Sequence, residues 1–256
     1  MKINEINEKL ELHKKWLNNE TEGQKADFSG MDLSGIDLSN RDLKHINFSN
    51  SNLKHAKLYE SDLSCANFSN ANILGASLYK SVLHKANFYN ASLQHACLSG
   101  SNLRYTHLTG ANLYKADLEK AYIVNTDLTE TNLNFAVLRN TNLKHSILFG
   151  ANLENADLSN SNLSYSDLRN TNISQASFYN TNICGVDFGE HVVQVYSFSD
   201  YSCFRCNNDF VVNCKRHTIE EWKNFTDEEI NEMDNTDKGV KALDFYHNVL
   251  LKIIDL

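Results

Sequence analysis

Large hydrophobic residues recur at every fifth position along most of this 256-residue chain. From Phe28 to Phe188 this register holds 33 consecutive positions, and each of them is Leu, Phe or Ile. Two residues earlier, a second series runs from Ser51 to Thr181 and contains only Ala, Ser and Thr. The residue directly before the large one is Asp or Asn at 23 of the 33 positions. The repeating unit is therefore a small residue, Asp or Asn, a large apolar residue and two further residues.

A period of five matches neither the 3.6-residue period of an α-helix nor the two-residue period of a plain strand. The large and small residues of each unit are two apart, so in an extended segment they face the same side. The two remaining residues are then available to turn a corner. Repetition of this unit predicts a coil with both series inside, in which successive turns pair like parallel strands about 4.8 Å apart.

The phenylalanines indicate how many units make one turn. They are separated by 20 residues or multiples of 20, which places them in one ladder if four units make a four-sided turn; these positions are Phe28, Phe48, Phe68, Phe88 and Phe188. A second column agrees with this period and reads almost entirely as Asn from Asn52 to Asn172. The sequence thus predicts an all-β solenoid, a quadrilateral parallel β-helix of about eight coils.

The repeat resembles that of the bacterial pentapeptide repeat proteins, whose pattern is Ala, Asp or Asn, Leu and two variable residues. The segments 151–155 (Ala-Asn-Leu-Glu-Asn) and 157–161 (Asp-Leu-Ser-Asn-Ser) match it closely, and the resemblance covers 26–188. It implies a right-handed four-sided β-helix. Some members of that family imitate duplex DNA and protect type II topoisomerases from quinolones, so the resemblance also implies binding to DNA gyrase as an alternative function.

The two ends of the chain do not follow the repeat. Residues 1–25 contain an amphipathic helix over 2–17 and are expected to cap the 26–188 β-helix, because an open β-helix leaves its end unpaired. Residues 189–256 are expected to form a mainly helical C-terminal cap with short strands first. Thr218-x-x-Glu221 and Thr226-x-x-Glu229 each resemble a capping box that opens a helix.

The last predicted helix, over about 237–254, has an apolar arc wider than one contact requires. Its members are Val240, Leu243, Tyr246, Val249, Leu250 and Ile253. We expect a homodimer through this helix, since a self-complementary patch most often closes a two-fold dimer. The alternative is that residues 190–235 fold over the arc and cover it.

Charge narrows the function classes. The net charge is −8, of which residues 26–188 carry −2 and residues 189–256 carry −6, so a general nucleic-acid binder is disfavoured. The first 17 residues are charged throughout and no run reaches membrane-spanning length, so neither a secretory signal nor a membrane anchor is expected. Six cysteines in such a chain favour the cytoplasm.

The sequence offers one candidate metal site and no convincing catalytic site. Cys203, Cys206, Cys214 and His217 have zinc-like spacing, but alternation along a strand would send Cys203 and Cys206 to opposite faces, so a structural zinc module remains an alternative. The recurring aspartates fall on different sides of the coil and do not converge, whereas acid–base catalysis needs two groups at one bond. We therefore expect no enzyme, no cofactor and no small-molecule substrate.

One corner of the predicted rod carries a sparse row of cations with histidines and tyrosines between them. Its members are Lys44, Lys85, Arg104 and Lys144. The row is either an ordinary solvated face or a docking site for an acidic partner. The leading hypothesis is accordingly a non-catalytic structural or protein-interaction scaffold with a protein partner of unknown identity.

Overall fold

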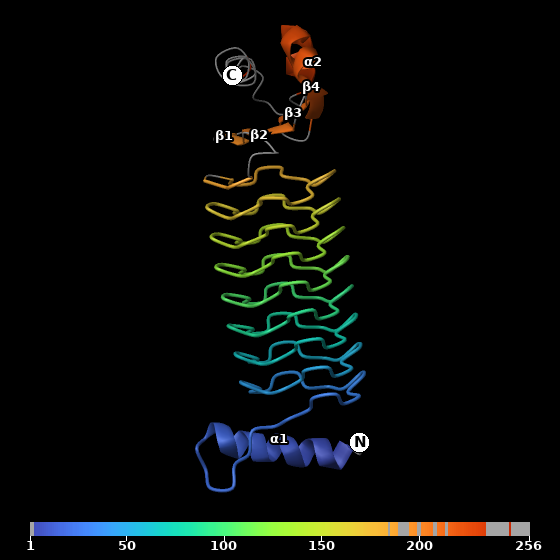
Figure 1. Ribbon diagram of the computed structural model, residues 1–256, viewed down its shortest axis with the longest axis vertical. Coiled ribbons are helices and arrows are strands. Elements are labelled where there is room, and N and C mark those ends of the chain that lie inside the picture. Colours follow the sequence, from blue (N-terminus) through green and yellow to red (C-terminus); the bar gives the residue numbers. More distant parts are fainter. Residues whose placement is uncertain are drawn as a thin grey trace.

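Each turn of the main coil takes 20 residues (Figure 1). The computed structural model describes residues 3–183, 185–188, 195–198, 201–206, 209–212, 215–233 and 246. Parallel bridges join each side to the residue 20 positions later, from Asp27 with Asn47 to Asp167 with Asp187. The expected four-sided coil is therefore present. Each contact between turns is an isolated bridge and not a continuous strand, because only about three residues of a unit are extended before the next corner.

Backbone hydrogen bonds tie both the sides and the corners of successive coils together. Leu33 donates its N–H to the carbonyl of Asn52 at 2.8 Å, and Asn52 donates back to Met31 at 2.8 Å. At the corner, the N–H of Gly35 donates to the carbonyl of Lys54 at 2.8 Å. The same pattern repeats along the rod, so the backbone polar groups of the inner coils find partners in neighbouring turns.

The corners explain why Asp and Asn precede the large apolar residue. The side-chain oxygen of Asp27 accepts the N–H of Ser29 at 2.8 Å, which closes a local turn. The last residue of each unit has a positive φ, for example 57° at Asn70 and 59° at His145. Asn adopts this left-handed conformation more readily than most residues, and Gly adopts it without strain. At Gly110 an added Cβ would also meet the side chain of Asn90 in the preceding coil.

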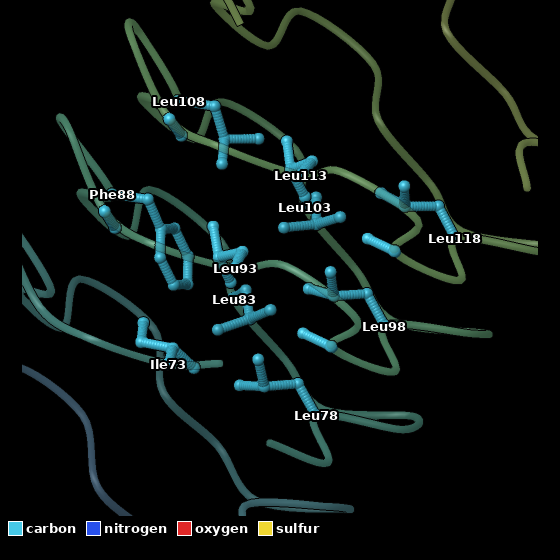
Figure 2. Packing of buried hydrophobic residues seen from close by; sticks show 14 of the residues in the cluster. Ile73, Leu78, Leu83, Phe88, Leu93, Leu98, Leu103, Leu108, Leu113 and Leu118 are labelled. Carbon is cyan, nitrogen blue, oxygen red and sulfur yellow. The ribbon is translucent and has the colours of Figure 1, made fainter. Parts of the chain in front are cut away.

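The interior consists of the two inward series packed in layers (Figure 2). The rings of Phe28, Phe48, Phe68 and Phe88 stack with centroid distances of 5.7, 5.2 and 4.7 Å. Phe188 lies on the same side in the last coil, separated from Phe88 by four leucines. Buried hydroxyls of the small series donate to backbone carbonyls, as Thr131 does to Leu128 at 2.7 Å, so Ser and Thr are accepted beside the apolar residues.

Helix α1 (Ile3–Leu17) lies across the open end of the first coil (Figure 1). Ile6 and Leu10 belong to the same buried cluster as the coil interior. The ammonium group of Lys9 donates to the carbonyl of Asp27 at 2.8 Å and lies 5.6 Å from the centre of the Phe28 ring. These contacts agree with the helix expected over 2–17.

Beyond the last coil, four short strands form an antiparallel sheet in chain order: β1 (Val195–Phe198), β2 (Tyr201–Cys206), β3 (Asp209–Val212) and β4 (Lys215–Thr218). The helices α2 (Ile219–Asn224) and α3 (Asp227–Met233) follow. The second capping box is present, because Thr226 and Glu229 exchange hydrogen bonds at 2.8 and 3.3 Å. The helix expected over 237–254 lies outside the described residues, apart from Tyr246.

Candidate functional site

One corner of the rod brings together the four cations that the sequence singled out. The corners of successive turns stack because their backbone groups are hydrogen-bonded. The backbone N–H of Lys85 donates to the carbonyl of Arg104 at 3.0 Å, and the backbone N–H of Asn125 donates to the carbonyl of Lys144 at 3.1 Å. Lys44 lies on the same corner two coils before Lys85. The 20-residue register therefore places all four residues along one edge.

Lys44 nevertheless differs from the other three. Its ammonium group lies 3.0 Å from a carboxylate oxygen of Asp42 and 3.2 Å from one of Asp62. Hydrogen bonds to these two carboxylates raise the pKa of Lys44 above its ordinary value. Burial raises the pKa of Asp62, but hydrogen bonds from Ser64 and Lys44 outweigh it and hold that pKa below its ordinary value. Lys44 keeps its place in the row, but Asp42 and Asp62, which precede and follow it on this corner, offset its charge.

The remaining cations lie in a stretch of this corner that we call the acid-free strip. It comprises five stacked units, residues 81–85, 101–105, 121–125, 141–145 and 161–165, and contains no Asp or Glu. Within the described part of the chain, none of Lys85, Arg104 and Lys144 forms an ion pair with a carboxylate. Their positive charges are therefore available to a partner.

Two of these cations lie over tyrosine rings of the next coil. The guanidinium of Arg104 is 5.5 Å from the centre of the Tyr122 ring, and the ammonium of Lys144 is 5.6 Å from that of Tyr165. Each such contact at an exposed site contributes about 0.5–1 kcal/mol. The cation pattern of the sequence does not single out Tyr122, although the 20-residue register pairs it with Asn102, two residues before Arg104.

Histidines complete the strip. The ring of His84 meets the ring of Tyr105 edge to face at 5.4 Å, and the ring of His145 stacks on Tyr165 at 5.3 Å. Tyr105, Tyr122 and Tyr165 remain about half exposed, at 48%, 50% and 56%. Exposed Tyr and Arg are the residue types that contribute most to protein–protein interfaces, so the strip has the composition of a binding surface.

The aspartates of the first coil serve the turns and do not form a catalytic cluster. Asp27, Asp32 and Asp37 lie on different sides of the coil, and each accepts a backbone N–H from the serine two residues later. Backbone and side-chain hydrogen bonds from Ser29 lower the pKa of Asp27. Among the residues that the structure describes, no group of three or more His, Cys, Asp or Glu is placed to hold a metal ion.

The zinc hypothesis remains untested by these observations. Cys203 and Cys206 lie in β2, where they pair in the backbone register with Val212 and Asp209, and His217 lies in β4 opposite Phe210. Cys214 lies outside the described residues. The hypothesis therefore stays a prediction.

Tyr246 is the single member of the candidate dimer helix within the described residues. Its side chain is 2% exposed, and its hydroxyl donates to the backbone carbonyl of Trp222 in α2. The expectation that Tyr246 contributes to an interface between copies is therefore wrong, because the chain's own α2 region covers it. Val240, Leu243, Val249, Leu250 and Ile253 lie outside the described residues.

Comparison with protein-family models identifies the repeat. The model described as pentapeptide repeats matches eight copies, over residues 32–65, 61–100, 93–129, 126–164 and 151–189. The chain belongs to the pentapeptide repeat family. Members of this family are generally structural or interaction proteins and not enzymes, and their fold is a right-handed quadrilateral β-helix.

Solved structures of other pentapeptide repeat proteins are similar to this chain. One is HetL from the cyanobacterium Nostoc sp. strain PCC 7120, a pentapeptide repeat protein involved in heterocyst differentiation regulation. It is 25% identical to this chain, the match covers 73% of this chain and 92% of HetL, and the TM-score is 0.49. QnrB1, a plasmid-mediated fluoroquinolone resistance protein, is 18% identical, with 65% and 91% covered and a TM-score of 0.56. The likeness to QnrB1 is one of fold. A comparison with curated proteins finds no match.

The three helices that the structure describes in this pentapeptide repeat protein are short or charged. None of those in the described ranges is both long and apolar enough to cross a membrane.

Proposed function

We propose that this protein is a non-catalytic interaction rod that binds a protein partner through the acid-free strip. The observation that carries the proposal is the contact of Arg104 and Lys144 with tyrosine rings of adjacent coils, in a surface without a neutralising carboxylate. Family membership supports a scaffold role, since the fold presents regular flat sides and corners.

The alternative is a DNA-mimicking protein that binds a type II topoisomerase. Such a role relies on a strongly acidic rod, because the mimic must reproduce the charge of phosphates. Residues 26–188 carry a net charge of only −2, and the acid-free strip is basic. These charges favour the scaffold. A gyrase supercoiling assay with added fluoroquinolone separates the two functions, and protection by micromolar protein would favour the mimic.

We also propose that two copies associate through the C-terminal helix over about 237–254. The support is the width of its apolar arc in the sequence, which remains broad even without Tyr246. In such a dimer the two α1 helices would lie at the far tips, and both acid-free strips would stay accessible along the sides.

The scaffold proposal is tested by photocrosslinking in cells that naturally produce the protein. The photoreactive residue benzoylphenylalanine replaces Tyr122 in the strip, or Tyr89 on a different corner as the matched control, because these tyrosines are 50% and 48% exposed. We expect a reproducible protein adduct from position 122 that position 89 does not give. Equal adducts from both positions, or none from position 122, would contradict the proposal.

A further inference from the structure

The acid-free strip holds two of its three cations in place before any partner arrives. Arg104 lies over Tyr122, and Lys144 lies over Tyr165 while His145 stacks on the same ring. Contacts of this kind restrict long side chains, so less conformational entropy is lost when an anion binds to them. The strip therefore presents ordered positive charge, in contrast to an isolated surface lysine.

The strip also has defined ends. Asp42 and Asp62 neutralise Lys44 on the same corner ahead of it, and the described helices α2 and α3 beyond the last coil carry six carboxylates and one lysine. The next unit on this corner, 181–185, also contains no Asp or Glu. The five coils of the strip span about 19 Å at the spacing of paired strands. This length corresponds to about six residues of an extended peptide or about thirteen residues of a helix.

The chemistry of the strip matches carboxylates. Arg104, Lys85 and Lys144 supply charged donors, and exposed tyrosine hydroxyls beside them can donate to the same oxygens. The tyrosine rings add apolar contact area for the methylene groups of Glu or for a neighbouring apolar residue. Resting on the proposed function, we infer that the strip binds a short acidic segment of a partner protein, rich in Asp and Glu.

A nucleic acid fits this surface less well. Single-stranded nucleic acids are bound by stacking bases on aromatic faces, but the faces of Tyr122 and Tyr165 are already occupied by Arg104 and by Lys144 with His145. A long polyanion would also extend past Asp62 and toward the acidic helices α2 and α3, where like charges repel it. A short acidic segment remains within the acid-free length.

The test uses the full chain and defined probes. A rhodamine-labelled twelve-residue peptide of alternating Glu and Ala is titrated by fluorescence anisotropy, beside the same peptide with Gln for Glu and a labelled oligothymidylate. The strip variant carries Arg104→Glu and Lys144→Glu. The matched control carries Lys54→Glu and Lys115→Glu, two exposed cations of another corner, of which Lys115 also lies over aromatic rings.

We expect the Glu peptide to bind the parent and the control variant alike, and to bind the strip variant at least ten-fold more weakly. Binding should weaken as salt rises from low to physiological concentration, because salt screens exposed charges. All four substituted residues are on the surface, and a circular dichroism spectrum unchanged from the parent verifies that each variant is folded.

Three results would overturn the inference: no saturable binding of the Glu peptide up to about 1 mM, equal weakening in both variants, or tighter binding of oligothymidylate than of the Glu peptide. If the Glu peptide does not bind but position 122 gives a specific adduct in cells, the proposed interaction function is retained and only the class of partner changes. Peptide binding at the strip without any adduct in cells would instead contradict the proposed function.

Discussion

The backbone N–H of Ala26 donates to Nδ1 of His13 at 3.1 Å, so a buried histidine joins α1 directly to the first residue of the coil. This hydrogen bond requires a neutral ring, because a protonated imidazole has no acceptor nitrogen. Burial lowers the pKa of His13 below its ordinary value of 6.5. The contact between helix and coil is therefore sensitive to acid.

The first prediction concerns pH. The pKa of His13 is lower in the folded state than in the unfolded state, so the unfolded state binds more protons as the pH falls. The stability that neutral His13 contributes is therefore complete above pH 6.5 and is lost as the pH falls below that value. The loss is about 0.5–1.5 kcal/mol, the usual net contribution of one hydrogen bond. Between about pH 7.5 and pH 5, the midpoint of thermal unfolding should decrease more in the parent than in His13→Gln. Parallel pH profiles of the parent and the variant would contradict the prediction.

The second prediction concerns the volume of the interior. Ala96 and Ala116 are at most 1% exposed and point into the coil, where added methylene groups force strain of about 1–3 kcal/mol or more. Either residue changed to Leu should lower the midpoint of thermal unfolding clearly. Lys54→Leu adds the same side chain on the outside and serves as the control. An unchanged midpoint in Ala96→Leu would mean that the interior has more space than the packing indicates.

The third prediction concerns the ladder of amides on the Phe28 side. The side-chain oxygen of Asn67 accepts the N–H of Ser69 at 3.1 Å and the amide of Asn87 at 3.3 Å. Asn67→Ala leaves both donors without this acceptor and should cost about 1 kcal/mol or more. Asn67→Asp retains the acceptor and should cost less. Denaturant unfolding of the two variants compares them, and the reverse order would show that the turn contact is unimportant.

The fourth prediction concerns the corners. Asn70 has a φ of 57°, a left-handed conformation that costs residues with a branched Cβ about 1–2 kcal/mol. Asn70→Val should therefore reduce the free energy of unfolding by this amount, while Asn70→Gly should change it little. Chemical denaturation measures both, and a Val variant as stable as the Gly variant would contradict the assignment of strain to this backbone position.

The fifth prediction concerns assembly. Sedimentation equilibrium of the full chain at tens of micromolar should give twice the 29.1 kDa monomer mass, and Val249→Glu with Ile253→Glu should give the monomer mass. A monomeric parent would end the dimer hypothesis. A variant that remains dimeric would place the interface elsewhere on the chain.

The architecture of the repeat follows from the sequence alone, because the period of five leaves no alternative register. Every unit from Phe28 to Phe188 has the residue pattern that forms an extended segment followed by a corner. Spacing of the phenylalanines by 20 predicted the stacked rings of Phe28 and Phe48, which the structure shows. The capping box of Thr226 and Glu229 could also be predicted from the sequence, since it depends on residues only three apart.

The four antiparallel strands from Val195 to Thr218 were only partly anticipated, because no repeat constrains their pairing and each strand depends on its neighbours. The character of the proposed binding surface also required the tertiary structure. Periodicity placed Lys44 and Arg104 on one corner, but it did not determine their side-chain torsions. In space, Lys44 reaches Asp42 and Asp62 and is neutralised, while Arg104 lies over Tyr122 of the next coil and remains charged. The repeat thus determines which residues share an edge, and the contacts between side chains of successive coils decide which of those residues can bind a partner.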